Sequence, residues 1–124
     1  MMKKFLLVIG LLFGFSGIAT ADGLTAPSLW KNQRGSELRI TSLTGSQLHG
    51  TFTNYAPNTQ CRGIAYPISG FTTSGPTQFT VNFVKCSTVT TWSGSAQPFG
   101  YSAGWVLRYK GQVEGGYDFF YRVN

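Results

Sequence analysis

The stretch Gln78-Phe79-Thr80-Val81-Asn82-Phe83-Val84 decides the class of fold. Apolar and polar residues alternate along it, so the side chains of Phe79, Val81 and Phe83 share one face of an extended chain. An amphipathic helix would instead place apolar residues three and four positions apart. The alternation therefore predicts a β-strand with one buried face.

Similar short runs continue on both sides of this stretch, separated by Gly, Pro, Asn and Ser. Turn chemistry is present in Thr44-Gly45-Ser46, Ser74-Gly75-Pro76 and Gly115-Gly116. Eight short strands joined by short turns predict an all-β fold, an antiparallel up-and-down β-barrel, because closing the sheet removes its exposed edges. The expected strands are Ser28–Gln33, Glu37–Leu43, Gln47–Thr53, Ala65–Thr72, Gln78–Val84, Thr88–Ala96, Gly104–Tyr109 and Gly116–Val123.

The first residues have the three regions of a secretory signal peptide. A positive start, Met1–Lys4, precedes the apolar run Phe5–Phe15, and Ala19-Thr20-Ala21 offers the small residues of a cleavage site. The apolar run is shorter than the roughly 20 residues that a membrane span needs. We therefore expect a signal peptide at 1–21 and one domain at 22–124. The mature protein is expected to be secreted or periplasmic, with no membrane association after cleavage.

The expected export bears on the chemical state of Cys61 and Cys86, the two cysteines of the chain. An oxidising compartment favours a disulfide, and two cysteines alone make a poor zinc site because structural zinc takes four ligands. A bridge across this loop of roughly 25 residues would stabilise the fold by about 3 kcal/mol in the loop-entropy model. The pair is expected to form a structural disulfide.

The chemical inventory argues against an enzyme. The chain has four acidic residues and one histidine, His49. No two of Asp22, Glu37, Glu114 and Asp118 suggest the carboxylate pair of a glycosidase, and no nucleophile-elbow or P-loop motif occurs. We expect a non-catalytic protein without a cofactor or a metal.

Several polar residues share the strand faces of large aromatic residues. A pocket lined by aromatic side chains with a few convergent polar groups is the usual form of a small-molecule site. The faces that combine the two kinds are Thr88/Thr90/Trp92, Trp105/Leu107/Tyr109, Gly116/Asp118/Phe120 and, across a turn at Gly35, Trp30/Asn32/Arg34/Ser36. Within the last set, Trp30 is expected in the core.

Five motifs follow one another over about Ser28 to Val123. They are Trp30-Lys31-Asn32-Gln33-Arg34-Gly35-Ser36, Gly50-Thr51-Phe52, Thr90-Thr91-Trp92-Ser93-Gly94, Gly104-Trp105-Val106-Leu107 and Gly116-Tyr117-Asp118-Phe119-Phe120. In this order they resemble the avidin and streptavidin family, and the third matches its streptavidin counterpart letter for letter.

The cysteines narrow this resemblance to the short, disulfide-containing dimeric bacterial avidins. Cys61 and Cys86 occupy the two loops that carry the disulfide in those proteins, and Tyr66-Pro67-Ile68-Ser69-Gly70 resembles the segment after the first cysteine. The resemblance implies an eight-stranded barrel that binds biotin with high affinity at one open end, without catalysis.

The resemblance also implies a role for each site residue. Asn32 and Ser36 would donate to the ureido oxygen of biotin, and Asp118 and Asn54 would each accept from one ureido N–H. Thr90 would face the sulfur and Thr88 the carboxylate. The apolar walls would be Phe83, Trp92, Trp105 and Leu107, with Phe52 at the position of a family tyrosine.

Three departures from the family pattern predict an affinity below that of streptavidin. Phe52 lacks the hydroxyl of the tyrosine that donates to the ureido oxygen, and Phe83 replaces a larger tryptophan. The segment Lys110–Gly115 is too short to carry the tryptophan that streptavidin lends to a neighbouring subunit. The last departure favours a homodimer over a tetramer.

Other interpretations of the same residues remain. Taken alone, Asp118 is expected to pair with Arg122 or Arg108, and the aromatic residues could be ordinary core. A basic, aromatic-rich barrel with net charge +6 could be a single-strand nucleic-acid binder. Its export signal and scattered positive charges argue against a nucleic-acid partner. The second alternative is an exported β-barrel interaction protein such as a glycosidase (lysozyme) inhibitor.

Overall fold

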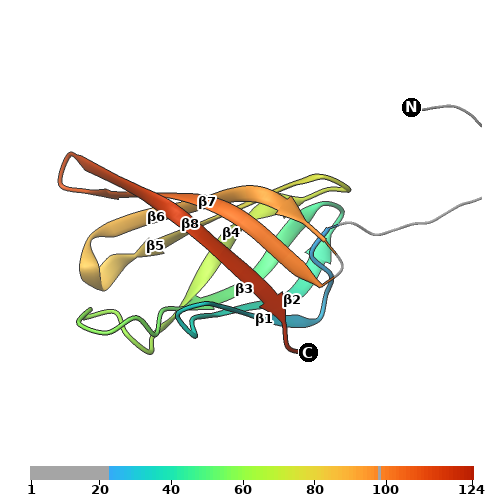
Figure 1. Cartoon of the computed structure of the whole chain (residues 1–124), viewed down its shortest axis with the longest axis horizontal. Coiled ribbons are helices and arrows are strands. Elements are labelled where there is room, and N and C mark those ends of the chain that lie inside the picture. Colours follow the sequence, from blue (N-terminus) through green and yellow to red (C-terminus); the bar gives the residue numbers. More distant parts are fainter. Residues whose placement is uncertain (1–22, 98) are drawn as a thin grey trace, which may run out of the picture.

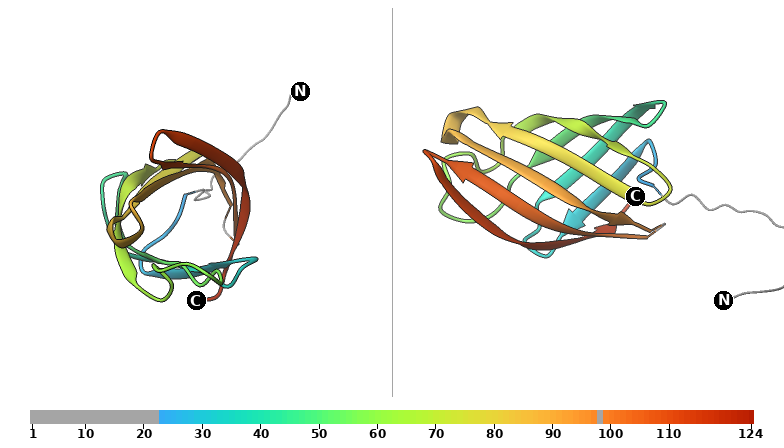
Figure 2. Two further views of the ribbon diagram at one scale, coloured as in Figure 1. Left: turned by 90° about the vertical axis from the view of Figure 1, so that its left-hand side faces the viewer. Right: turned by 90° about the horizontal axis from the view of Figure 1, so that it is seen from above.

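Eight antiparallel strands close into a barrel in which each strand pairs with the next and β1 pairs with β8. The computed structural model of the chain describes residues 23–97 and 99–124, and no helix among them is long and apolar enough to cross a membrane. Figure 1 labels the strands, and the end view in Figure 2 shows the closed ring. The strands are β1 Ser28–Asn32, β2 Glu37–Thr44, β3 Gln47–Thr53, β4 Ala65–Thr72, β5 Pro76–Phe83, β6 Thr88–Ala96, β7 Gly100–Tyr109 and β8 Gln112–Arg122.

The predicted up-and-down barrel is confirmed, and β3, β4 and β6 have the predicted bounds. The expected signal peptide at 1–21 lies outside the described residues. Three strand starts were predicted wrongly. β5 begins at Pro76 rather than Gln78. β7 begins at Gly100 rather than Gly104, and within the added residues 100–103 Tyr101 and Ala103 are buried in the core. β8 begins at Gln112 rather than Gly116.

The error in β8 has a clear physical cause. The turn between β7 and β8 is Lys110-Gly111, whose φ angles of 48° and 78° are typical of a tight two-residue hairpin turn. The pair Gly115-Gly116, predicted as the turn at which the last strand begins, lies within β8. Gly116 pairs with Trp105, and a Cβ there would lie 2.5 Å from Trp105 Cζ2, so the indole ring requires glycine at this position.

Aromatic rings fill much of the barrel interior. Phe52 lies between other rings, with its centroid 4.7 Å from that of Trp92 and 6.0 Å from that of Phe83. Phe79 stacks on Trp92 at 4.7 Å with an interplanar angle of 11°. Trp30 is 1% exposed, which confirms its prediction as a core residue. These packed rings surround the inner part of the site with rigid apolar walls.

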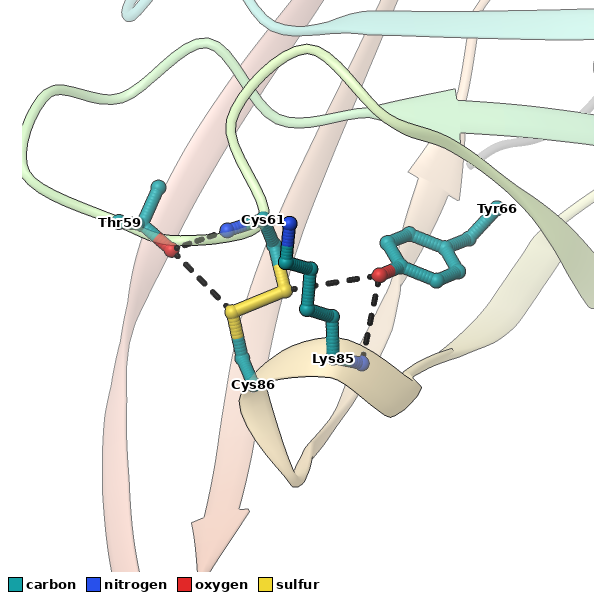
Figure 3. Close-up of a disulfide and its surroundings, with 5 residues drawn as sticks. All are labelled: Thr59, Cys61, Tyr66, Lys85 and Cys86. Carbon is teal, nitrogen blue, oxygen red and sulfur yellow. Dashed lines mark hydrogen bonds between the residues drawn. A yellow bond between two sulfur atoms is a disulfide. The ribbon is translucent and has the colours of Figure 1, made fainter.

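A disulfide joins Cys61 to Cys86, as predicted, with 6.0 Å between their Cα atoms (Figure 3). Cys61 lies in the loop between β3 and β4, and Cys86 ends the short 3-10 helix η1, Val84–Cys86. The Tyr66 hydroxyl accepts from the Lys85 backbone N–H at 3.3 Å and lies 3.7 Å from Cys61 Sγ. The bridge therefore ties two loops together at the same end of the barrel.

Candidate ligand-binding site

A cavity of about 300 Å³ lies inside the barrel at the end formed by the β3–β4 loop, η1 and the β7–β8 hairpin. This end faces the viewer in the left part of Figure 2. The cavity brings together every residue that the sequence predicted for the site. They are Asn32, Ser36, Phe52, Asn54, Phe83, Thr88, Thr90, Trp92, Trp105, Leu107 and Asp118.

The Asp118 carboxylate is the central charged group of the cavity, and its side chain is only 2% exposed. Its Oδ2 accepts from Trp92 Nε1 at 2.8 Å and from Asn32 Nδ2 at 3.4 Å. Its Oδ1 accepts from Gln33 Nε2 at 2.7 Å and forms an ion pair with Arg34. The predicted alternative of a pairing with Arg122 or Arg108 is wrong, because Asp118 points inward whereas those arginines are exposed.

The turn between β1 and β2 fixes the orientation of Asn32. Asn32 Oδ1 accepts from the backbone N–H groups of Arg34 and Ser36, each at 3.0 Å. Gly35 has a φ of 80°, a left-handed conformation that glycine adopts without strain. With its oxygen held by two backbone donors, the Asn32 side chain must present its amide N–H groups to the cavity.

Ser36 and Asn54 form a second polar pair. Ser36 Oγ accepts from the Tyr55 backbone N–H at 2.9 Å and donates to Asn54 Oδ1 at 3.4 Å. Asn54 Oδ1 also accepts from the Ala56 backbone N–H at 2.8 Å. Asn54 is thus held as an acceptor, and the Ser36 hydroxyl proton can turn between Asn54 and another acceptor in the cavity.

The remaining walls combine large apolar side chains with threonine hydroxyls. The rings of Phe52, Phe83 and Trp92 are at most 5% exposed. Trp105 and Leu107 on β7 are half-buried. The other predicted members, Thr88 and Thr90, come from β6, and Thr90 is 3% exposed. Apolar walls with a few polar groups at fixed positions are suited to a small organic molecule.

The prediction missed several cavity residues. Arg34 shares the strand face of Asn32 and Ser36, which was the available signal, but its contact with Asp118 depends on β1 closing against β8. The disulfide was predicted as structural, yet both cysteines also line the cavity. The missed lining residues are Arg34, Ala56, Thr59, Cys61 and Cys86.

The comparison with known families agrees with this geometry. The model of the avidin family matches residues 20–120. The chain belongs to the avidin family. One relative, afifavidin of Afifella pfennigii, is 34% identical to this chain over 119 residues, a match that covers 86% of this chain and 75% of afifavidin.

Solved avidin structures share the fold. The bradavidin2–biotin complex has a TM-score of 0.77 and 40% identity, and the match covers 82% of this chain and all of that one (100%). The rhizavidin–biotin complex has a TM-score of 0.74 and 30% identity, over 81% of this chain and 93% of that one. The family resemblance identified from the five motifs is confirmed.

Proposed function

We propose that this avidin-family chain binds biotin with high affinity, without catalysis, in the cavity at the open end of the barrel. The observation that carries the proposal is the position of the Asp118 carboxylate, which is buried beside the Asn32 amide at one end of an apolar cavity. Biotin has a ureido ring with one carbonyl acceptor and two N–H donors, followed by apolar parts. A buried carboxylate and a fixed amide donor complement this ring.

The ureido oxygen accepts from Asn32 and Ser36. Asn32 is already oriented as a donor by its turn, so it loses no further rotational freedom on binding. Ser36 contributes by turning its hydroxyl proton away from Asn54 and toward the ligand. Asn54 Oδ1 then accepts a ureido N–H in place of the Ser36 hydroxyl, so no polar group of this pair is left unpaired.

The second ureido N–H donates to Asp118. This hydrogen bond to a buried charge is stronger than a bond between two neutral groups, and it polarises the ureido ring toward Asn32 and Ser36. Phe83, Trp92, Trp105 and Leu107 pack on the fused rings and the alkyl tail. Thr90 faces the ligand sulfur, and Thr88 lies near the carboxylate.

Two features hold the affinity below that of streptavidin. Phe52 lines the cavity without a hydroxyl, so the ureido oxygen has one protein donor fewer. The two-residue turn Lys110-Gly111 brings no tryptophan to the mouth of a neighbouring cavity. A bound ligand is therefore more exposed to water at the mouth.

A calorimetric titration of the oxidised mature protein with biotin tests this function. We expect saturation at one biotin per chain with a submicromolar Kd. A millimolar Kd, or no heat together with no thermal shift, would contradict it. Hydrolysis or modification of biotin during the titration would contradict the non-catalytic part of the proposal.

The proposed assembly is a homodimer of secreted or periplasmic chains. The outer face of β7 and β8 exposes Val106, Tyr117, Phe119 and Tyr121, with Tyr117 at 85% exposure. Exposed apolar patches of this kind mark interaction surfaces, and a second copy is the proposed occupant. Sedimentation analysis should give a dimer for the parent and a monomer for Tyr117→Glu, and a monomeric parent would contradict the dimer.

The Cys61–Cys86 disulfide supports the proposed export, because disulfides persist in oxidising compartments.

A further inference from the structure

Donors from the protein itself fill the acceptor capacity of the Asp118 carboxylate. A carboxylate offers about four lone-pair sites. Trp92 and Asn32 occupy Oδ2, and Gln33 and Arg34 occupy Oδ1. A ureido N–H that donates to Asp118 must therefore displace or weaken one of these protein donors.

Three of the four donors are held in place by other contacts. The Trp92 ring is 5% exposed and stacks on Phe79. The Asn32 oxygen is held by two backbone N–H groups of its own turn. Gln33 Oε1 accepts from the Phe119 backbone N–H at 3.1 Å, which holds the Gln33 amide beside Asp118.

Arg34 is the donor that is free to leave. Its side chain is 41% exposed, whereas that of Asp118 is 2% exposed. Its guanidinium carbon lies 5.9 Å from the centroid of the Trp105 ring, so the side chain extends along the cavity wall between Asp118 and Trp105. A half-exposed arginine regains hydration when it turns outward, and a ureido N–H that replaces it keeps the buried Asp118 carboxylate hydrogen-bonded, so the exchange leaves no buried charge unpaired.

We propose that Arg34 is an internal competitor for the ligand: its guanidinium pairs with Asp118 and must leave when a ureido N–H binds there. This inference rests on the proposed biotin site and assigns to Arg34 control of the rate and affinity of binding. While it is paired, the Arg34 guanidinium partly neutralises the negative charge of the carboxylate and covers part of the Trp105 ring. Both effects weaken the binding of the ligand.

Stopped-flow association and calorimetry on Arg34→Met and Arg34→Gln test the proposal. We expect both variants to bind biotin more tightly and to associate faster, each by about tenfold, which is about 1.4 kcal/mol in binding free energy. Arg108→Met is the matched control, because Arg108 is an exposed β7 residue outside the cavity lining. This control removes the same charge and should leave the Kd and the association rate near those of the parent.

The neutral primary amide of biotin serves as a second probe, because it removes any effect of the protein's positive charge on an anionic ligand. The same gain with this probe supports competition at Asp118. Unchanged or weaker binding of both probes by both Arg34 variants, with parental melting temperatures, would overturn the inference. Failure of the parent itself to bind biotin would instead contradict the proposed function.

Discussion

Replacing Asp118 with Asn removes the buried charge of the cavity while keeping the size of the side chain. The lowest-energy orientation keeps the amide oxygen toward Trp92 Nε1, which donates to Asp118 at 2.8 Å and belongs to a residue that is only 5% exposed. The new NH₂ group then faces Gln33 and Arg34. Arg34, whose side chain is 41% exposed, can turn into solvent, but Gln33 Nε2, which donates to Asp118 Oδ1 at 2.7 Å, loses its acceptor.

The structure separates the expected loss of binding from the loss of stability. A hydrogen bond to a charged group contributes about 1.5–3 kcal/mol, so Asp118→Asn should raise the Kd for biotin by about 10- to 150-fold. The folded state keeps the hydrogen bond of Trp92, and it loses the hydrogen bond of Gln33 and an ion pair with a half-exposed partner. We therefore expect the free energy of unfolding to fall by about 2 kcal/mol.

Calorimetric titration with biotin and thermal unfolding measure the two effects on the same sample. Glu37→Gln is the matched control, because its carboxylate lies 3.9 Å from Lys31 with 29% side-chain exposure and does not line the cavity. The control should bind as the parent does. A folded Asp118→Asn variant with the parental Kd would refute the assignment of Asp118 as the acceptor of a ureido N–H.

Three further predictions concern other parts of the barrel. Phe52→Tyr adds the missing hydroxyl beside the ureido oxygen. At about 1 kcal/mol for one hydrogen bond, it should lower the Kd for biotin by about fivefold, and an unchanged Kd in calorimetry would contradict the proposed pose. Gly116→Ala puts a Cβ 2.5 Å from Trp105 Cζ2 and should shift Trp105 fluorescence and weaken binding, whereas Gly75→Ala, in open space, should do neither. Burial raises the pKa of Tyr101, whose hydroxyl donates to a backbone oxygen at 2.8 Å. As the pH rises, Tyr101 ionises in the unfolded chain before it ionises in the folded chain. The contribution of the neutral Tyr101 side chain to the free energy of unfolding is therefore complete below about pH 10 and is lost as the pH rises above that value. Chemical denaturation at a series of pH values should show this loss in the parent and not in Tyr101→Phe.

The barrel was predictable because its strands carry the pattern locally. Phe79, Val81 and Phe83 alternate with polar neighbours, and they are buried in the structure as that alternation requires. The site was predictable because its residues occur in ordered motifs that resemble the family's. Trp92 and Asp118, for example, are adjacent in the cavity although their motifs are far apart in sequence.

The features that were predicted wrongly or missed from the sequence depend on contacts between strands. Gly115 and Gly116 have the composition of a turn, and only the packing of Trp105 against Gly116 explains why they lie within a strand. Arg34 lies on a turn where most arginines would be solvated, and its ion pair with Asp118 forms only when the barrel closes β1 against β8. No local pattern reports a contact of this kind.

A crystal structure of this chain grown with biotin would show directly how the ligand lies in the cavity. We expect the ureido ring at the inner end of the cavity, with one N–H within hydrogen-bond distance of Asp118 and the other within that distance of Asn54. The ureido oxygen should lie beside Asn32 and Ser36. Biotin bound with its carboxylate at the inner end, or at a site outside this cavity, would contradict the proposed binding mode.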